Sequence, residues 1–472
     1  MKFFLALLAA ASAELLNVKV NRKVSLQQHY LKVETSVTIK NTGDNPKSRV
    51  KLLPDPTLQS KLSSFLVYQN GGSVWIDPES WEAQLSEPVA AGQTVDLKVE
   101  EVYTHVFTPL PESIKQTADQ LMVYEGSLHH FSPYKIRREQ ISFTFPAKKI
   151  ISHFPTEGAK KVGKAINFPD FKDLSANQDE IFKTHYEANI QFLSTHYLFR
   201  EVEVSHWGNV KVENNAEVRH RGAILDGSYS RVQYGHDGGD DASNVHWVPK
   251  LTAVLPVDSY DVYYGDQIGN ISTSRMRQHH NRVEVEMRPR TPLFGGWKAE
   301  FTMRYNLPSE AALFHARSDS SRYTLKLKAI DHLYSNQVID EVEINVVLPE
   351  SATNIEIKVP AGYERGHDQL KYTYLDITGR PIIVLRAKNL AGKSLDQMLE
   401  VSYTFPAGAI YREPAMTIMF FMTIFLCVML IVQRVWKNRK KILTYYEILN
   451  TNSIHIMLAK FHNVKLSFQR AV

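Results

Sequence analysis

The residues best suited to chemistry form an acidic loop, His236-Asp237-Gly238-Gly239-Asp240-Asp241. Some sugar-transferring enzymes hold a metal ion and a nucleotide sugar with an Asp-x-Asp pair, and oxygen ligands on a glycine-rich loop suit Ca²⁺ or Mg²⁺. However, the spacing does not match an EF-hand, and the flanking Ser, Gly and Asn residues are typical of an exposed turn. We therefore predict a solvated turn here, with no metal site and no cofactor.

Two adjacent histidine pairs, His129-His130 and His279-His280, are the next candidates. Neighbouring residues on a strand point to opposite faces, so neither pair can chelate one metal ion without a bend. We expect all four side chains on the surface. The sequence contains no His-Glu-x-x-His, Gly-x-Ser-x-Gly, phosphate-binding loop or dinucleotide fingerprint. Carboxylates brought together from distant strands stay open as an alternative, but we predict no catalytic residue.

One short motif has a definite chemical consequence. Asn270-Ile271-Ser272 is the single Asn-x-Ser/Thr in the sequence with x other than Pro. In a chain that enters the secretory pathway, an exposed asparagine of this kind is a glycan acceptor. Ile268-Gly269 just before it is typical of a turn. We therefore predict a glycan on Asn270; the alternative is a sequon that is not used.

A membrane anchor lies near the C-terminus. The eighteen residues Ala415–Val432 contain no charged residue, Gly or Pro, and as a helix they span roughly 27 Å, enough for a bilayer core. A buried core helix would need no basic flank, whereas cationic residues crowd the C-terminal side of this segment: Arg434, Lys437, Arg439, Lys440 and Lys441. Cationic loops stay cytosolic, so we predict a transmembrane helix at 415–432 and a cytosolic tail at 433–472.

The N-terminus is typical of a signal peptide. Lys2 precedes an apolar run, Phe3–Ala10, and Ala11-Ser12-Ala13 has the small-x-small pattern of a cleavage site. We predict removal of residues 1–13, with cleavage between Ala13 and Glu14. A cleaved signal followed by one C-terminal span makes a single-pass type I membrane protein with an outer or lumenal ectodomain.

Charge and cysteine content exclude further classes. The tail carries eight Lys or Arg residues and one acidic residue, Glu447, so its net charge is +7. Because the net charge of the whole chain is +5, the residues before the tail have a net charge of −2. The ectodomain is therefore not a nucleic-acid surface. Cys427 is the one cysteine and lies inside the predicted span, so the ectodomain has neither a disulfide nor a thiol site. Large domains with full cores need no such bond, and its absence mildly favours the endoplasmic reticulum.

The ectodomain has the two-residue period of β-strands. Apolar and polar residues alternate in short runs separated by Pro, Gly and Asn: 31–39, 95–100, 141–145, 202–204, 283–287, 323–327 and 342–347. The segments Pro111–Leu121 and Ser309–His315 are candidates for a short turn or helix. About 400 residues exceed what one core usually organises. We therefore predict a mainly β protein with two antiparallel β-sandwich-like domains, at 14–197 and 198–410.

An internal repeat supports two domains. Leu31–Gly43 aligns with Val210–Gly222, sharing Lys, Val, Glu and the closing Gly. In the same order, 107–111 resembles 304–308, and 141–146 resembles 344–349. Any two strands share alternation, so the common order is the significant feature, and it indicates a duplicated β-domain.

Longer blocks carry a specific resemblance. The stretch Asp261-Val-Tyr-Tyr-Gly-Asp-Gln-Ile-Gly-Asn-Ile-Ser-Thr-Ser274 is similar to a signature of the ribophorin I family. Further blocks with this similarity are Glu203–Asn209, Arg288–Trp297, Tyr372–Pro381, Val123–Gly126 and Ser132–Tyr134. The resemblance extends from about Asn17 to the membrane span. The chain is therefore identified as a member of that family.

The resemblance implies a non-catalytic accessory subunit of the oligosaccharyltransferase complex in the endoplasmic reticulum membrane. That complex transfers a preassembled glycan from dolichyl diphosphate to Asn of Asn-x-Ser/Thr in nascent polypeptides. In this family a separate multispanning subunit holds the metal and the active site. The implied partners are that subunit, the other subunits and nascent polypeptides, and the implied tasks are to position the polypeptide and to stabilise the complex.

The tail departs from the family pattern. Many animal relatives continue into a long charged helical region, whereas this chain stops within forty residues of the span. The tail is apolar and basic, which suits an interfacial helix on the cytosolic leaflet. A contact with the translocon or ribosome is therefore not carried over to it. Two other classes compete with the subunit interpretation: a free-standing lumenal chaperone or receptor, and a glycosyltransferase in its own right.

Overall fold

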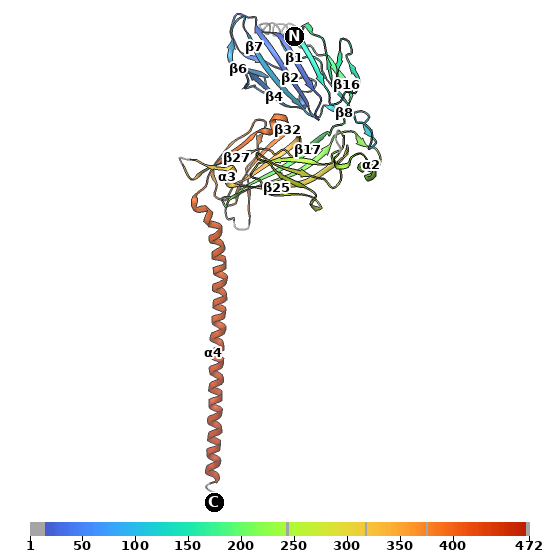
Figure 1. The fold of residues 1–472 in the computed structure, drawn as a ribbon. Coiled ribbons are helices and arrows are strands. Elements are labelled where there is room, and N and C mark those ends of the chain that lie inside the picture. The colour runs from blue at the N-terminus through green and yellow to red at the C-terminus, as the bar shows by residue number, and fades with distance from the viewer. Residues whose placement is uncertain (1–14, 242–244, 317–318, 374–375, 469–472) are drawn as a thin grey trace, which may run out of the picture. The chain divides into compact units, whose positions relative to one another are not determined.

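The protein contains one β unit and one helical unit. A computed structural model describes residues 15–241, 245–316, 319–373 and 376–468, so the predicted cleavage between Ala13 and Glu14 lies outside the described residues. The β unit comprises residues up to 371 together with 378–405, and the helical unit comprises 372–377 and the residues from 406 onward. Figure 1 labels the main strands of the β unit and the long helix α4.

The strands up to β16 pair among themselves, with the exception of the two-residue strand β9, and we call residues 15–192 the N-terminal half of the β unit. Its largest sheet has the strand order β13 (Lys160–Val162), β14 (Ala165–Asn167), β11 (Ile136–Thr144), β1 (Leu15–Ser25), β2 (Leu31–Asn41), β7 (Thr94–Tyr103), β4 (Leu62–Gln69), β5 (Gly72–Val74), with β15 (Phe171–Leu174) also pairing with β11. A second sheet has the order β12 (Ile150–Phe154), β16 (Ile181–Glu187), β10 (Leu121–Ser127), β8 (Phe107–Pro109). β3 (Lys47–Lys51) pairs with β6 (Glu82–Val89), and the 3₁₀ helix η2 covers Gln59–Lys61.

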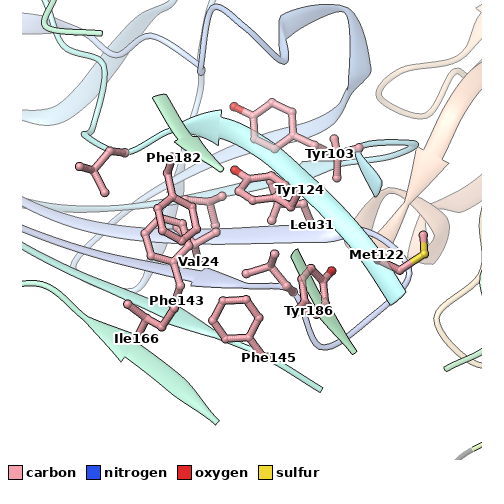
Figure 2. Packing of buried hydrophobic residues seen from close by; sticks show 14 of the residues in the cluster. Val24, Leu31, Tyr103, Met122, Tyr124, Phe143, Phe145, Ile166, Phe182 and Tyr186 are labelled. Atoms are coloured by element: carbon pink, nitrogen blue, oxygen red, sulfur yellow. The ribbon is translucent and has the colours of Figure 1, made fainter. Parts of the chain in front are cut away.

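One core cluster of this half lies between its two larger sheets, and a second lies between the largest sheet and the β3–β6 pair. Alternate residues of β2 are buried, as the two-residue period predicts, and they meet apolar residues of the facing sheet. Figure 2 shows Phe143 of β11 beside Phe182 of β16, and their stacked ring centroids are 3.8 Å apart. Each fully buried side chain of this size contributes about 1.5–3 kcal/mol to folding. The two sheets therefore form the sandwich that the pattern predicts.

The strands from β17 onward form the C-terminal half (residues 193–405). The largest sheet has the order β22 (Gly269–Asn270), β21 (Tyr260–Asp266), β25 (Lys298–Pro308), β18 (Asn209–His220), β17 (Leu193–Val204), β28 (Val338–Val347), β32 (Arg380–Ala391), β30 (Glu364–Arg365), with β31 (Gln369–Lys371) also on β32. Smaller sheets are β20 (Leu251–Leu255), β24 (Val283–Met287), β23 (Arg275–Gln278), and β26 (Leu313–His315), β27 (Arg322–Lys328), β33 (Met398–Thr404), β29 (Thr353–Lys358). β19 (Ile224–Leu225) pairs with β9 (Ser113–Ile114) of the other half.

Short helices complete the β unit. They are α2 (Arg231–His236), α3 (Ser309–Ala312), η3 (Gly239–Asp241) and η4 (Gly392–Asp396). Of the two segments that we considered for a turn or helix, Ser309–His315 contains α3. Pro111–Leu121 instead holds β9 and a turn.

The two halves repeat one topology. In each large sheet the first strand, β1 or β17, pairs in parallel with a later strand, β11 or β28. It also pairs antiparallel with its successor, β2 or β18, and the next strands follow in the same chain order: β7, β4, β5 in one half and β25, β21, β22 in the other. The duplication predicted from sequence is therefore present in the strand order.

The strand register tests the three sequence matches. Arg22 of β1 faces Thr35 and Ile141, and Arg200 of β17 faces Asn214 and Ile344. This register confirms the matches that begin at Leu31/Val210 and at Ile141/Ile344. The match of 107–111 with 304–308 is wrong, because the first segment lies on β8 of a different sheet while the second is the end of β25.

The mainly β fold is confirmed, with one difference in detail. All seven alternating runs fall on strands, apart from Phe145, which lies one residue beyond β11. The large sheets are mixed rather than purely antiparallel, because β1–β11 and β17–β28 are parallel. Alternation shows which face of a strand is buried and carries no information about strand direction.

The helical unit contains the predicted span. The 3₁₀ helix η5 (Ala407–Tyr411) leads into α4 (Arg412–Phe468), where Pro414 sits in the first turn, a position that needs no backbone N–H. Among the described residues this is the one helix long and apolar enough to cross a membrane, and its apolar stretch is not buried by protein. The tail residues up to 468 continue the same helix.

Candidate functional site

The sequon lies on a tight hairpin. β21 and β22 are joined by Gln267 and Ile268, and the Asp266 carboxylate accepts hydrogen bonds from the backbone N–H groups of Ile268 (3.0 Å) and Gly269 (3.1 Å). Asn270 is exposed, whereas the side chain of Ile271 is buried. The predicted turn is therefore confirmed, and the buried isoleucine fixes a backbone from which Asn270 faces solvent. The glycan itself stays a prediction.

A second block of the sequence supports this hairpin. Arg290 donates from Nε to Asp266 Oδ2 (2.5 Å) and from Nη2 to Oδ1 (2.9 Å), a fork that keeps the pKa of Asp266 at about 2. An open cavity of about 300 Å³ lies here, lined among others by Tyr264, Lys298 and Glu300. Lys298 Nζ is 2.7 Å from Glu300 Oε1. The two carboxylates at this cavity, Asp266 and Glu300, are therefore each paired with a cation.

The acidic loop follows α2. The Tyr234 hydroxyl donates to Asp240 Oδ1 (2.6 Å), and Arg288 Nη1 donates to Asp240 Oδ2 (3.2 Å). The residues His236–Gly238 are exposed and end the helix in a turn, as predicted. Within the part of the chain that the structure describes, no three His, Cys, Asp or Glu residues are grouped as metal ligands. Asp240 is thus a structural partner of α2 and of Arg288.

One histidine prediction is wrong. His279 and His280 are exposed as expected, but His129 and His130 are buried. His129 Nδ1 is 2.8 Å from Glu139 Oε2, and the His130 backbone N–H donates to Glu139 Oε1 (2.7 Å). Burial lowers the pKa of His130 to about 4, so its ring is neutral. The pair follows the end of β10, and Glu139 of β11 bonds the His129 ring and the His130 backbone, while His130 Nε2 makes no hydrogen bond to any described residue.

A buried arginine organises the N-terminal half. Arg22 donates to the backbone oxygens of Leu128 and His129, and its Nη2 is 3.9 Å from Asp55 Oδ2. Glu101 is buried nearby and accepts from the Tyr103 hydroxyl (2.5 Å). Burial raises the pKa of Glu101 to about 7, although the Arg22 charge opposes this shift. This network ties loops of both sheets to β1.

The C-terminal half has an arginine at the equivalent position. Arg200 Nη1 donates to Asp331 Oδ2 (2.5 Å) and to Asn214 Oδ1 (2.8 Å). The Tyr305 hydroxyl also donates to Asp331 Oδ2 (2.7 Å). Burial by itself lowers the pKa of Arg200, but the Asp331 charge outweighs it and the pKa is raised. The cation is therefore permanent and closely paired.

A carboxylate joins the two halves. Asp340, on β28, accepts from Arg221 Nη2 (2.7 Å), and its other oxygen is 2.7 Å from His105 Nε2, just beyond β7. His196 Nδ1 is 3.3 Å away. Burial by itself raises the pKa of Asp340, but the hydrogen bond and charge of His105 and the charge of Arg221 leave it below the ordinary value. Asp340 is thus ionised and anchors the joint.

A second set of contacts crosses the same joint. Lys393, on η4, donates to Glu100 Oε2 (2.6 Å) and to the Tyr68 hydroxyl (3.0 Å), and it lies 4.8 Å from the Tyr68 ring centroid. Asn389 Nδ2 donates to the Leu62 carbonyl (2.9 Å). Sequence reasoning missed both sets because the partners from opposite halves lie more than 230 positions apart. The strand pattern alone gave no signal for them.

The chain is similar in sequence to known proteins over most of its length. A sequence model of the family described as Ribophorin I matches residues 15–432, which leaves the tail outside the match. Dolichyl-diphosphooligosaccharide–protein glycosyltransferase subunit 1 of Caenorhabditis elegans is 34% identical over 435 residues, covering 90% of this chain and 73% of that protein. Subunit 1A of Arabidopsis thaliana is 31% identical over 446 residues, covering 89% and 71%.

The solved structures add nothing about function. An M1 zinc metallopeptidase from Deinococcus radiodurans matches 44% of this chain and 42% of its own at 10% identity, with a TM-score of 0.26, which is too weak to carry an inference. The sequence similarity is much stronger than the structural similarity, since it covers most of the chain at above 30% identity. This chain belongs to the ribophorin I family.

Proposed function

We propose that the chain is a non-catalytic accessory subunit of the oligosaccharyltransferase complex, which transfers a preassembled glycan from dolichyl diphosphate to Asn-x-Ser/Thr of nascent polypeptides. The observation that carries this proposal is the similarity, over about 90% of the chain, to proteins named as subunit 1 of that glycosyltransferase. The other subunits, among them a multispanning catalytic one, and nascent polypeptides are then its partners.

The polar clusters support an accessory role. Two carboxylates of the regions considered for chemistry are already engaged: Asp240 by Tyr234 and Arg288, and Asp266 by Arg290. The buried arginines bind structural carboxylates inside the core. Ion pairs of this kind stabilise the fold and are typical of structural networks. We infer that the β unit contributes binding surfaces for other members of the complex rather than catalytic groups.

The membrane arrangement belongs to the same proposal. The basic residues that follow the span place the tail in the cytosol, and the β unit then lies in the lumen of the endoplasmic reticulum. Cleavage between Ala13 and Glu14 and a glycan on Asn270 follow from that topology. We further propose the two-domain division at 14–197 and 198–410, although β17 already begins at Leu193.

A native pull-down tests the assignment. The tagged full chain, extracted from membranes in mild detergent, is expected to co-migrate with a multispanning membrane subunit and with transfer activity. A chain that migrates alone contradicts the proposal. Transfer by the isolated β unit, abolished by Asp240→Ala, would instead show a glycosyltransferase in its own right.

Depletion separates a subunit from a folding receptor. Loss of an accessory subunit predicts that sequons of particular glycoproteins become underoccupied. Loss of a chaperone or receptor predicts misfolded clients whose sequons are normally occupied. Mass spectrometry of site occupancy, together with protease sensitivity of the same proteins, distinguishes the two outcomes.

A further inference from the structure

An exposed tryptophan lies at the tip of the hairpin between β17 and β18. Trp207 is 60% exposed, although an indole ring gains much free energy from burial. It belongs to the block Glu203–Asn209, to which the proposed function assigns no role. A single exposed apolar residue is common on protein surfaces, so its position in the fold decides whether it has a function.

The hairpin tip has a fixed backbone. The Ser205 N–H donates to the Asn209 carbonyl (3.1 Å), and the Trp207 N–H donates to Ser205 Oγ (3.1 Å). Ser309, at the start of α3, supports the turn: its N–H donates to the Gly208 carbonyl (3.0 Å) and its Oγ donates to the Ser205 carbonyl (3.1 Å). The indole is therefore held on a rigid turn, and a partner can bind it without ordering a loop first.

The same tip packs against the end of the β unit. The His206 ring stacks on Phe405, with ring centroids 4.1 Å apart and an interplanar angle of 6°. The Tyr403 hydroxyl lies 3.0 Å from His206 Nε2. Burial lowers the pKa of His206 to about 4, so the ring is neutral. Because Phe405 is the last residue of the β unit, Trp207 lies next to the point where the chain leaves that unit.

A second exposed aromatic residue belongs to this end of the C-terminal half. Phe314, on β26, is 47% exposed and lies opposite Thr324 of β27. Thr324 pairs in turn with Ser402 of β33, three positions before Phe405. The end of the β unit from which the chain continues to the span therefore carries aromatic side chains on its surface.

The bilayer is within reach of that end. In the helical unit the span 415–432 lies between the exposed side chains of Tyr411 and Trp436, and aromatic residues of this kind are enriched at the two bilayer interfaces. Tyr411 thus marks the interface on the side of the β unit. It follows Phe405 by six positions, and even a fully extended chain of that length spans at most about 20 Å. The covalent link keeps Phe405 within that distance of the interface.

We propose that Trp207 and Phe314 insert into the headgroup region of the leaflet on the side of the β unit and hold this end of the unit on the membrane. Aromatic rings are favoured there, because the ring meets apolar chain segments while the indole N–H keeps a polar partner. A neighbouring protein is the other candidate. Lipid is favoured because the short link to the span ensures that a bilayer surface is nearby. The inference depends on the span and not on the proposed subunit role.

Labelling with a photoreactive lipid tests the contact on the unaltered chain. The full chain is reconstituted in phosphatidylcholine vesicles that contain a phosphatidylcholine with a diazirine close to its headgroup, and labelled tryptic peptides are quantified by mass spectrometry. We expect the peptide Glu201–Lys211, which contains Trp207, to be labelled at least tenfold more than Leu62–Lys98. The second peptide contains Trp75, which is 68% exposed in the N-terminal half. Equal labelling of the two peptides would overturn the proposal.

Matched variants separate lipid contact from folding. Trp207→Ala removes an exposed side chain, so the melting temperature should change little while labelling of the 201–211 peptide falls about five- to tenfold. Trp207→Tyr keeps an aromatic ring suited to the interface and should retain at least half of the labelling. Trp75→Ala should leave it unchanged. Undiminished labelling in Trp207→Ala would refute the membrane contact.

The assembled complex distinguishes lipid from protein as the occupant. A photoreactive phenylalanine at position 207, activated in native membranes, should add the mass of one lipid to the chain. A crosslink to another protein in place of lipid would overturn this proposal and support the proposed function. A chain that labels with lipid but migrates without other subunits would refute the proposed function and leave the membrane contact standing.

Discussion

The two halves of the β unit share a strand order and differ in how they neutralise one buried arginine. Arg22 and Arg200 occupy the same register position. Arg200 holds one carboxylate, Asp331, at 2.5 Å, whereas Arg22 lies 3.9 Å from Asp55 with Glu101 and Glu139 also near enough to act on it. Backbone pairing therefore fixes where the cation sits, whereas the counter-charge comes from different elements in the two halves: Asp331 outside any strand in one, and Asp55 together with Glu101 on β7 and Glu139 on β11 in the other.

The two networks differ in how many acids neutralise the arginine. In the C-terminal half the charge is tied to a single, closely bonded acid. In the N-terminal half three acids have other partners as well: Ser127 for Asp55, Tyr103 for Glu101 and His129 for Glu139. One of them, Glu101, can take up a proton near neutral pH. Loss of the cation should therefore cost the two halves unequal amounts.

Removal of the arginines is expected to have the largest effect. Arg200→Met leaves Asp331 buried without its cation and should lower the free energy of unfolding by about 3–5 kcal/mol. Arg22→Met should cost less, about 1–3 kcal/mol, because Arg22 lies 3.9 Å from Asp55, whereas Arg200 lies 2.5 Å from Asp331. Urea unfolding of the full chain in detergent, followed by fluorescence, measures both. The double variant Arg200→Met/Asp331→Leu should recover most of the loss, and equal losses in the two single variants would break the comparison.

The next effect is a pH dependence that Glu101 contributes in the N-terminal half. The pKa of Glu101 is raised to about 7 by burial, so its contribution to stability is full below its unfolded pKa of about 4.3 and is lost as the pH rises through 7. A shift of this size corresponds to about 3 kcal/mol. Glu101→Gln keeps an acceptor for Tyr103 and should remove that dependence. The test is the difference between wild-type and variant unfolding energies from pH 4.5 to 8, and a flat difference would contradict it.

A smaller effect is expected at the joint. Asp340→Asn removes the charge that binds Arg221 and His105 and should cost about 1–2 kcal/mol, since the carboxylate is partly exposed. Hydrogen exchange should increase around β28 and the end of β7 and stay unchanged in the two sandwich cores. Asp368→Asn, which disturbs an exposed pair within one half, is the matched control. Unchanged hydrogen exchange at the joint would show that other contacts hold the two halves together.

The smallest effect on stability is expected at the sequon. Asn270→Gln should abolish one glycan, seen as a mobility shift identical to that from glycosidase digestion, and should change the unfolding energy by less than about 0.5 kcal/mol because the side chain is exposed. Asn281→Gln, an exposed asparagine outside any sequon, should leave the mobility unchanged. Wild-type chain that does not shift on digestion would show that the sequon is not used.

Sequence predicted what depends on local spacing. The alternation in Val283–Met287 and the apolar run Ala415–Val432 define a strand and a helix because each is a pattern along the chain. The parallel β1–β11 pair has no such pattern. His129 looked like a surface residue because Glu139, which satisfies it, lies on another strand. The proposed function came from the sequence blocks that resemble the ribophorin I family and not from the strand periodicity.

The parallel pairs impose an order on assembly. β1 lies in the middle of its sheet, yet its partner Ile136 follows Asn17 by 119 positions, so the first sheet stays incomplete until β11 has been synthesised. The second sheet waits likewise for β28, the strand that bears Asp340. A chain made from its N-terminus can thus close the first sandwich before β28 exists. The bond between Asp340 and His105 therefore cannot form until β28 has been synthesised, well after the first sandwich.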